Sequence, residues 1–165
     1  MVRGAFVVGS VAWALALPLA TFVASRPRSP ALVYPLAFAV YATGSVICHQ
    51  LPERSFHLWG AQMPVCARCA GIYLGAALAV LAAAAPLKRR RTNEPASPLP
   101  VGHRFSAAAL AGLDVRVALA LAAVPTLATL LYEWTTGVTP ANGIRALAGL
   151  ALGAAVATVI EREVN

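Results

Sequence analysis

The chain has 165 residues, of which 59% are hydrophobic and only 12% are charged, and its mean hydropathy is +0.72. Soluble domains usually carry about a quarter charged residues, so this composition excludes an ordinary soluble domain and indicates a membrane protein. The net charge of +7 does not indicate nucleic-acid binding, because the basic residues gather between apolar runs and are not interleaved with aromatic ones.

Successive apolar runs predict an all-α fold, an integral membrane bundle of about five transmembrane helices in a single domain, residues 1–165. A helix needs about 20 residues to cross a bilayer. We expect the first run to be a retained helix and not a cleaved signal peptide, because it is long and no A-x-A site follows it. The expected helices cover residues 4–24, 31–47, 70–86, 115–134 and 143–160.

Two connecting segments differ from the rest. Residues 48–69 form a polar loop between the second and third expected helices, and residues 87–104 form a basic, proline-rich linker. Basic residues mark the cytoplasmic side of a membrane protein, so we expect this linker to be cytoplasmic.

Five spans place nine basic residues on the side of that linker and four on the other side. The nine are Arg26, Arg28, Lys88, Arg89, Arg90, Arg91, Arg104, Arg116 and Arg162, and the four are Arg3, Arg54, Arg68 and Arg145. This bias predicts a multi-pass protein of the plasma membrane with its N-terminus outside, its C-terminus in the cytoplasm, and loop 48–69 extracytoplasmic. The bilayer is the expected partner, and no protein partner follows from the sequence.

All three cysteines of the chain lie in loop 48–69. Cys66 and Cys69 form a C-x-x-C at the expected start of a helix, where the helix N-terminus and a neighbouring arginine favour thiolates. Cys48 and His49 lie at the other end of the loop. Cys3His sites bind zinc, so Cys48, His49, Cys66 and Cys69 are predicted metal ligands, with His57 as the alternative fourth ligand. The ion would be zinc or another thiolate-favouring metal such as iron or copper.

Two other interpretations of the cysteines stay open, so the sequence does not decide whether the protein is an enzyme. The first is a membrane thiol–disulfide oxidoreductase with Cys66 or Cys69 as nucleophile and Cys48 as exchange partner, similar in logic to quinone-linked disulfide oxidases. Such enzymes normally use a second cysteine pair, which this chain lacks. In the second interpretation the cysteines only pack or staple the loop, and the chain is a small scaffold or subunit of a membrane complex.

Charged residues on the same side of the membrane are expected to support the loop. Arg54 and Arg68 need acidic partners at a lipid boundary, and Glu53 and Glu133 are the acids available there. Together with Arg145 and the start of the third helix, the two arginines could also form an anion-binding pocket.

Other polar and small residues are expected around the same region. Tyr73 lies one helical turn beyond Cys69, and Asn142 lies near the start of the last helix. Small residues at four-residue spacing permit close contact between membrane helices. Such pairs are Gly71 with Gly75 and Gly149 with Gly153.

The loop carries a dense set of motifs: C-H-Q at 48–50, P-x-R-S-F at 52–56, Gly60, and P-x-C-x-R-C-x-G-x-Y-x-G at 64–75. This signature resembles a family of predicted bacterial and archaeal membrane proteins known as domain of unknown function 2085. The likeness is looser toward the C-terminus, where Asn142, Arg145 and Gly149 are similar to the family but Glu133-Trp134 stands near the place of an expected Asp-Gly. The resemblance implies an integral membrane protein with its signature in one loop, and implies no substrate, cofactor or activity.

Overall fold

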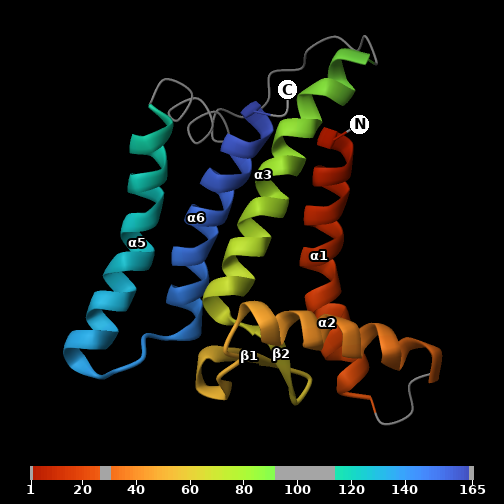
Figure 1. The fold of residues 1–165 in the computed structure, drawn as a ribbon, viewed down its shortest axis with the longest axis vertical. Helices are drawn as coiled ribbons and strands as arrows, with labels where there is room; N and C mark the ends of the chain where they lie inside the picture. The colour runs from red at the N-terminus through yellow and green to blue at the C-terminus, as the bar shows by residue number, and fades with distance from the viewer. Residues whose placement is uncertain (1, 27–30, 92–113, 164–165) are drawn as a thin grey trace.

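Four long helices packed side by side make up most of the computed structural model, which describes residues 2–26, 31–91 and 114–163 (Figure 1). They are α1 (Val2–Ala24), α3 (Ala67–Arg91), α5 (Val115–Thr136) and α6 (Asn142–Glu163). Each is long and apolar enough to cross a membrane. The predicted all-α membrane bundle is thus confirmed.

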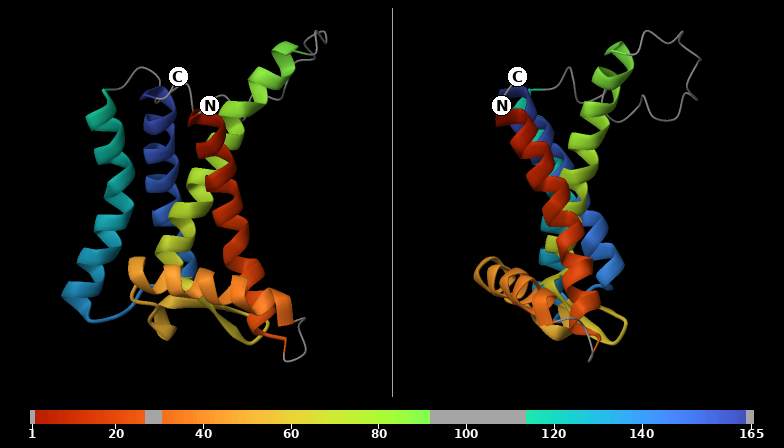
Figure 2. Two further views of the ribbon diagram at one scale, coloured as in Figure 1. Left: turned by 45° about the vertical axis from the view of Figure 1, so that its right-hand side comes forward. Right: turned by 90° about the vertical axis from the view of Figure 1, so that its right-hand side faces the viewer.

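The second helix differs from the other four. A short 3-10 turn, η1 (Ala31–Val33), leads into α2 (Tyr34–Ile47), which has 14 residues. At 1.5 Å per residue it is about 21 Å long, shorter than the roughly 30 Å hydrocarbon core of a bilayer. It lies across the end of the bundle instead of along it (Figures 1 and 2). Within the described residues the bundle therefore has four candidate spans and one transverse helix.

The transverse position of α2 changes the expected arrangement of the chain ends. Val2 and Glu163 lie at the same end of the bundle, whereas the expected five spans would put them on opposite sides (Figure 1). An ion pair of 3.5 Å between Arg3 Nη2 and Glu161 Oε2 joins α1 to α6 at this end. We call it the terminal end, and the end that carries α2 the hairpin end.

The expected loop 48–69 is a folded unit. It contains a 3-10 turn, η2 (Pro52–Arg54), and an antiparallel hairpin of β1 (Ser55–Leu58) and β2 (Ala61–Cys66). Trp59 and Gly60 form its two-residue turn with φ of 53° and 81°, since two positive φ angles suit the twist of a tight hairpin.

One face of the hairpin is buried against the helices. Met63 and Val65 of β2 belong to a hydrophobic cluster with Leu17 and Ala20 of α1 and with Val40 of α2. Val65 is completely buried. The hairpin thereby closes the end of the bundle and fixes the segments on either side of it.

The backbones of α3 and α6 approach each other so closely that only glycine fits at four positions between them. A Cβ added at Gly71 or Gly75 would collide with backbone carbonyl groups of α6, and one added at Gly149 or Gly153 would collide with those of α3. The predicted close contact at these glycines is confirmed. It sets the relative height of the two helices.

The boundaries of α3 differ from the expected ones at both ends. The helix begins at Ala67, directly after Cys66, and continues to Arg91, so residues 87–91 of the expected linker are helical. The remainder of the expected linker, with His103, lies outside the described residues.

Candidate metal centre

Three separate elements bring the three cysteines together at the hairpin end. Cys48 directly follows α2, Cys66 ends β2, and Cys69 lies in the first turn of α3. Their Sγ atoms all lie within 4.8 Å of one another. All three are free thiols and partly buried. The structure thus assembles the predicted sulfur ligands although Cys66 lies 18 positions after Cys48 in the sequence.

The backbone at Cys48 turns the chain from α2 toward the hairpin. The Cys48 N–H donates to the carbonyl of Gly44 at 2.9 Å, and its φ of −147° and ψ of 139° end the helix in an extended conformation. The backbone N–H of Cys66 donates to Cys48 Sγ at 3.2 Å. This hydrogen bond fixes Cys48 beside the end of β2.

Gln50 holds the hairpin against α2. Its Nε2 donates to the carbonyl oxygens of Tyr41, at 3.0 Å, and Pro64, at 2.6 Å. Its backbone has a φ of 49°, which turns the chain sharply after Cys48. A Cβ at Gly44 would collide with the Pro64 carbonyl, so a glycine is required where β2 crosses α2.

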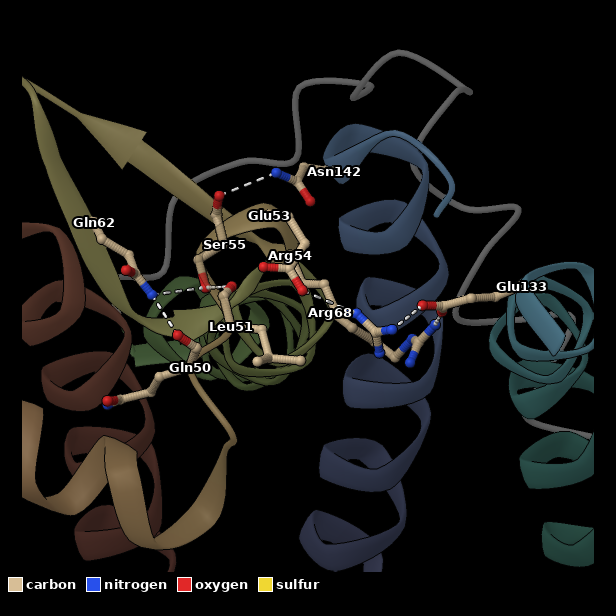
Figure 3. A network of polar contacts seen from close by, with 9 residues as sticks. All are labelled: Gln50, Leu51, Glu53, Arg54, Ser55, Gln62, Arg68, Glu133 and Asn142. Atoms are coloured by element: carbon tan, nitrogen blue, oxygen red, sulfur yellow. Dashed lines mark hydrogen bonds and ion pairs between the residues drawn. The ribbon is translucent and has the colours of Figure 1, made fainter. Parts of the chain in front are cut away.

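A second amide extends this network across the hairpin. Gln62 Nε2 donates to the Gln50 carbonyl at 2.5 Å, and Tyr41 Oη donates to the Gln62 carbonyl at 2.5 Å. At the far side Asn142 Nδ2 donates to the Ser55 carbonyl at 3.0 Å, joining the start of α6 to β1 (Figure 3). The hairpin is therefore bound by hydrogen bonds to α2 on one side and α6 on the other.

The surroundings of Cys66 lower the pKa of its thiol. A hydrogen bond from the Cys69 side chain lowers the pKa of Cys66 to about 5. Burial opposes this change, while the Cys69 backbone N–H, the Cys48 side chain and the Arg68 backbone N–H add to it. Cys66 is thus a thiolate at neutral pH, the form that binds metals and attacks disulfides.

The two candidate histidines occupy different surroundings. A pocket of about 340 Å³ is lined by all three cysteines and by His49, which is otherwise exposed. His57 is exposed on β1, paired with Gln62 across the hairpin, and does not line the pocket. Of the two, His49 is the one that lines the pocket, but it does not belong to the group of ligand atoms that lie within 4.8 Å of one another.

Glu133 of α5 is the acidic partner of the arginines. It is 7% exposed, and its carboxylate lies 2.6 Å from Arg54 Nη2 and 4.0 Å from Arg68 Nη2 (Figure 3). Arg68 Nη2 also donates to Thr129 Oγ1 at 3.2 Å. Glu53 lies 3.9 Å from Arg54 and is largely exposed. The expected pairing of the arginines with these acids is observed, and it ties the hairpin and α3 to α5.

Arg145 and Tyr73 complete the surroundings of the cluster. Arg145, in the first turn of α6, is 1% exposed and lines the pocket. Its Nε and Nη1 have no hydrogen-bond partner among the described residues. Tyr73 packs edge to face on Trp13 of α1, with ring centroids 5.9 Å apart. It lies beside the hydrophobic cluster as well as beside Cys69.

Sequence reasoning assigned no role to three residues that position the site. Gln50 belongs to the C-H-Q motif, which singled it out without indicating its function. Tyr41 and Gln62 gave no signal, because their hydrogen bonds depend on how β2 crosses α2. The hairpin itself had one signal, a two-residue Trp59-Gly60 connection between short apolar runs.

Comparison with known proteins agrees with the signature of the loop. A family model described as predicted membrane protein (DUF2085) matches residues 48–159. Uncharacterized protein MJ1492 of Methanocaldococcus jannaschii is 55% identical over 40 residues, which are 24% of this chain and 26% of that protein. An uncharacterized protein of Methanothermobacter thermautotrophicus is 63% identical over 30 residues, 18% of this chain and 27% of that protein.

The chain thus spans about a quarter of the length of the curated relatives it matches. No solved structure matches it.

Proposed function

This chain belongs to the DUF2085 family of predicted membrane proteins, and from that premise we propose that it is a metal-binding integral membrane protein. The proposal rests on one observation, the three Sγ atoms within 4.8 Å of one another. With Zn–S distances of 2.3 Å, tetrahedral geometry requires sulfur atoms about 3.8 Å apart. A contraction of about 1 Å or less would therefore let Cys48, Cys66 and Cys69 bind one ion.

The donor set favours a soft or borderline metal. Three thiolates suit zinc, iron or copper(I) better than magnesium or calcium. His49 is the best-placed fourth ligand, because it lines the pocket with the cysteines. If His49 binds, the site is closed and structural, and if water or a substrate occupies the fourth position, the site is of the catalytic kind. His57 would require the hairpin to rearrange.

The same proximity also supports the second candidate, thiol–disulfide exchange. Cys66 as thiolate would attack a substrate disulfide, form a mixed disulfide and release the first substrate thiol. Cys69 or Cys48 would then attack the mixed disulfide and release the second substrate thiol. The substrate is then reduced to two thiols while two cysteines of this protein are oxidised to a disulfide. Metal content and thiol count separate the two candidates, because a bound metal keeps all three sulfurs reduced.

We place this single membrane domain in the plasma membrane with four spans and the metal centre outside. Among the described residues, seven basic ones belong to the terminal end and four to the hairpin end (Figure 1). The seven are Arg3, Lys88, Arg89, Arg90, Arg91, Arg116 and Arg162, and the four are Arg26, Arg54, Arg68 and Arg145. The positive-inside rule then puts the terminal end in the cytoplasm, so both chain ends are cytoplasmic and the cysteines remain extracytoplasmic.

The exposed apolar side of α2 supports this placement. Leu36, Phe38 and Val46 are 70–85% exposed, which suits a helix lying in the membrane boundary and not one surrounded by water. The cysteines at the end of α2 would then lie near the headgroups of the outer leaflet.

The test is to purify the protein in detergent without reducing agent, measure bound metals by mass spectrometry, and count free thiols before and after chelation. We expect about one ion per chain, lost in Cys66→Ser and in Cys69→Ser and retained in the matched surface control His57→Ala. Reduced metal occupancy in His49→Ala would identify His49 as the fourth ligand.

Two outcomes contradict the metal proposal. A metal-free protein with a reversible disulfide supports thiol–disulfide exchange. A metal-free protein with three unreactive thiols leaves only a scaffold role for the loop.

A further inference from the structure

The pocket beside the cysteines is rich in positive charge. Arg54, Arg68 and Arg145 all line it, and none of the described residues that line it is acidic. Glu133 is the buried carboxylate beside them and pairs with Arg54 and Arg68. Glu53, which is largely exposed, lies 3.9 Å from Arg54, so the ion pairs involve Arg54 and Arg68 but not Arg145.

Arg145 is the buried arginine of the three. It is 1% exposed, and no acidic side chain among the described residues forms an ion pair with it. An arginine buried without an anionic partner is strongly disfavoured, so a bound anion would stabilise the arrangement.

Arg145 shows where that anion would lie. Its side chain is almost completely buried, yet Nε and Nη1 donate to nothing among the described residues. The Nε atoms of Arg54 and Arg68 are also buried and have no hydrogen-bond partner among the described residues, although Arg54 Nε lies 3.9 Å from Glu53 Oε1. Hydrogen-bond donors on three side chains around one pocket are thus left for an external acceptor.

We propose that this pocket binds a phosphate group, held by Arg145 and Arg68 with Arg54 at its edge. The three arginines come from α6, α3 and η2, so they approach from different directions. This arrangement suits the several oxygens of a tetrahedral oxyanion better than the two oxygens of a carboxylate. Planar guanidinium groups bind phosphate oxygens in pairs. The phosphate is either inorganic or the headgroup of a phospholipid, since the chemistry is the same.

The binding test uses detergent-purified full-length protein treated with chelator, so that it does not depend on the metal proposal. Sodium phosphate is titrated while the thermal unfolding midpoint is measured, with sodium chloride at equal ionic strength as the reference. A ligand that binds the folded state raises the midpoint in a saturable way. We expect this rise in the native protein.

Arg145→Lys keeps the charge and most of the stem but loses the paired donors, and we expect its half-saturating phosphate concentration to be at least tenfold higher. Arg116→Lys, exposed at the terminal end, is the matched control and should respond like the native protein. Arg68→Lys repeats the test should Arg145→Lys fail to fold.

The source of the phosphate is resolved by native mass spectrometry of the same preparations. One phospholipid retained per chain in the native protein and lost in Arg145→Lys or Arg68→Lys assigns the pocket to a headgroup, and inorganic phosphate then acts only after delipidation. The proposal is overturned if phosphate acts like chloride and no lipid is retained, or if both lysine variants behave like the native protein. If the native protein binds no metal but responds normally to phosphate, the metal proposal is refuted and the phosphate proposal is supported.

Discussion

Arg54 of η2 lies 2.6 Å from Glu133 of α5, so a residue of the signature loop is paired with a helix that begins 61 residues further along the chain. Glu133 also faces Arg68 of α3. One buried carboxylate therefore holds three segments together at the hairpin end. Its removal should affect stability more than that of any exposed acid.

We expect Glu133→Gln to destabilise the protein by about 3 kcal/mol, because it removes the buried counter-charge of the partly buried Arg54 and Arg68. The measurement is the thermal unfolding midpoint in detergent, determined by circular dichroism. Glu53→Gln is the matched control, since Glu53 pairs with Arg54 in solvent and should cost at most about 1 kcal/mol. Equal effects of the two substitutions would contradict the assigned role of Glu133.

A methyl group at Gly153 should separate α3 from α6. The Cβ of Gly153→Ala would collide with the carbonyl of Ile72, a backbone group that can move only with its helix. Such overpacking costs about 1–3 kcal/mol. Gly9→Ala, within α1, meets nothing within 4 Å and should leave stability unchanged or slightly raise it. Similar melting curves for the two variants would show that the glycine contact is not required.

Gln50→Leu should weaken metal binding without removing a ligand. The substitution preserves approximate size but removes the donors to Tyr41 and Pro64, so the hairpin keeps only the hydrogen bond from Tyr41 Oη to Gln62 as its attachment to α2. Groups that orient metal ligands typically contribute 10- to 100-fold in affinity. Competition with a chromophoric zinc chelator measures the change, and Ser45→Ala, on the exposed side of α2, is the control. Unchanged zinc affinity in Gln50→Leu would show that the hydrogen bonds of Gln50 do not position the cysteines.

Thiol labelling should locate the two ends of the bundle. After reduction and chelation, a maleimide that cannot cross membranes is expected to label the native cysteines in intact cells, because the hairpin end faces outward. A fourth cysteine introduced as Arg116→Cys at the terminal end should be labelled only after the cells are made permeable. Peptide mass mapping distinguishes the positions. The reverse pattern would invert the proposed orientation.

Composition alone predicted a helical membrane bundle, because lipid as solvent permits so many apolar side chains. It did not predict the transverse position of α2. Residues 31–47 are as apolar as a span, but Pro35 lies within the first turn of the regular helix, which has only 14 residues. Apolar composition does not distinguish a helix that crosses a membrane from one that lies along it.

Local spacing predicted the cysteine cluster well, because Cys66 and Cys69 share one helix start and Cys48 ends the preceding helix. The burial of Arg145 could not be predicted in the same way. It depends on the height of α6 relative to α3, which is set by contacts between residues 68–75 and 146–153. Gly71, Gly75, Gly149 and Gly153 indicated that these helices would meet but not which side chains would face the pocket.

The glycine contact also sets the angular position of the pocket residues. Arg145 lies one turn before Gly149, and Cys69 lies two residues before Gly71, so both are carried by the most closely packed part of the bundle. One alanine inserted between Arg145 and Gly149 would leave the glycines in place and rotate the guanidinium by about 100° around α6. The helices that fill the membrane would then be intact while the pocket had lost its most deeply buried arginine, so the rotation of a single helix about its axis decides whether this end of the molecule can bind an anion.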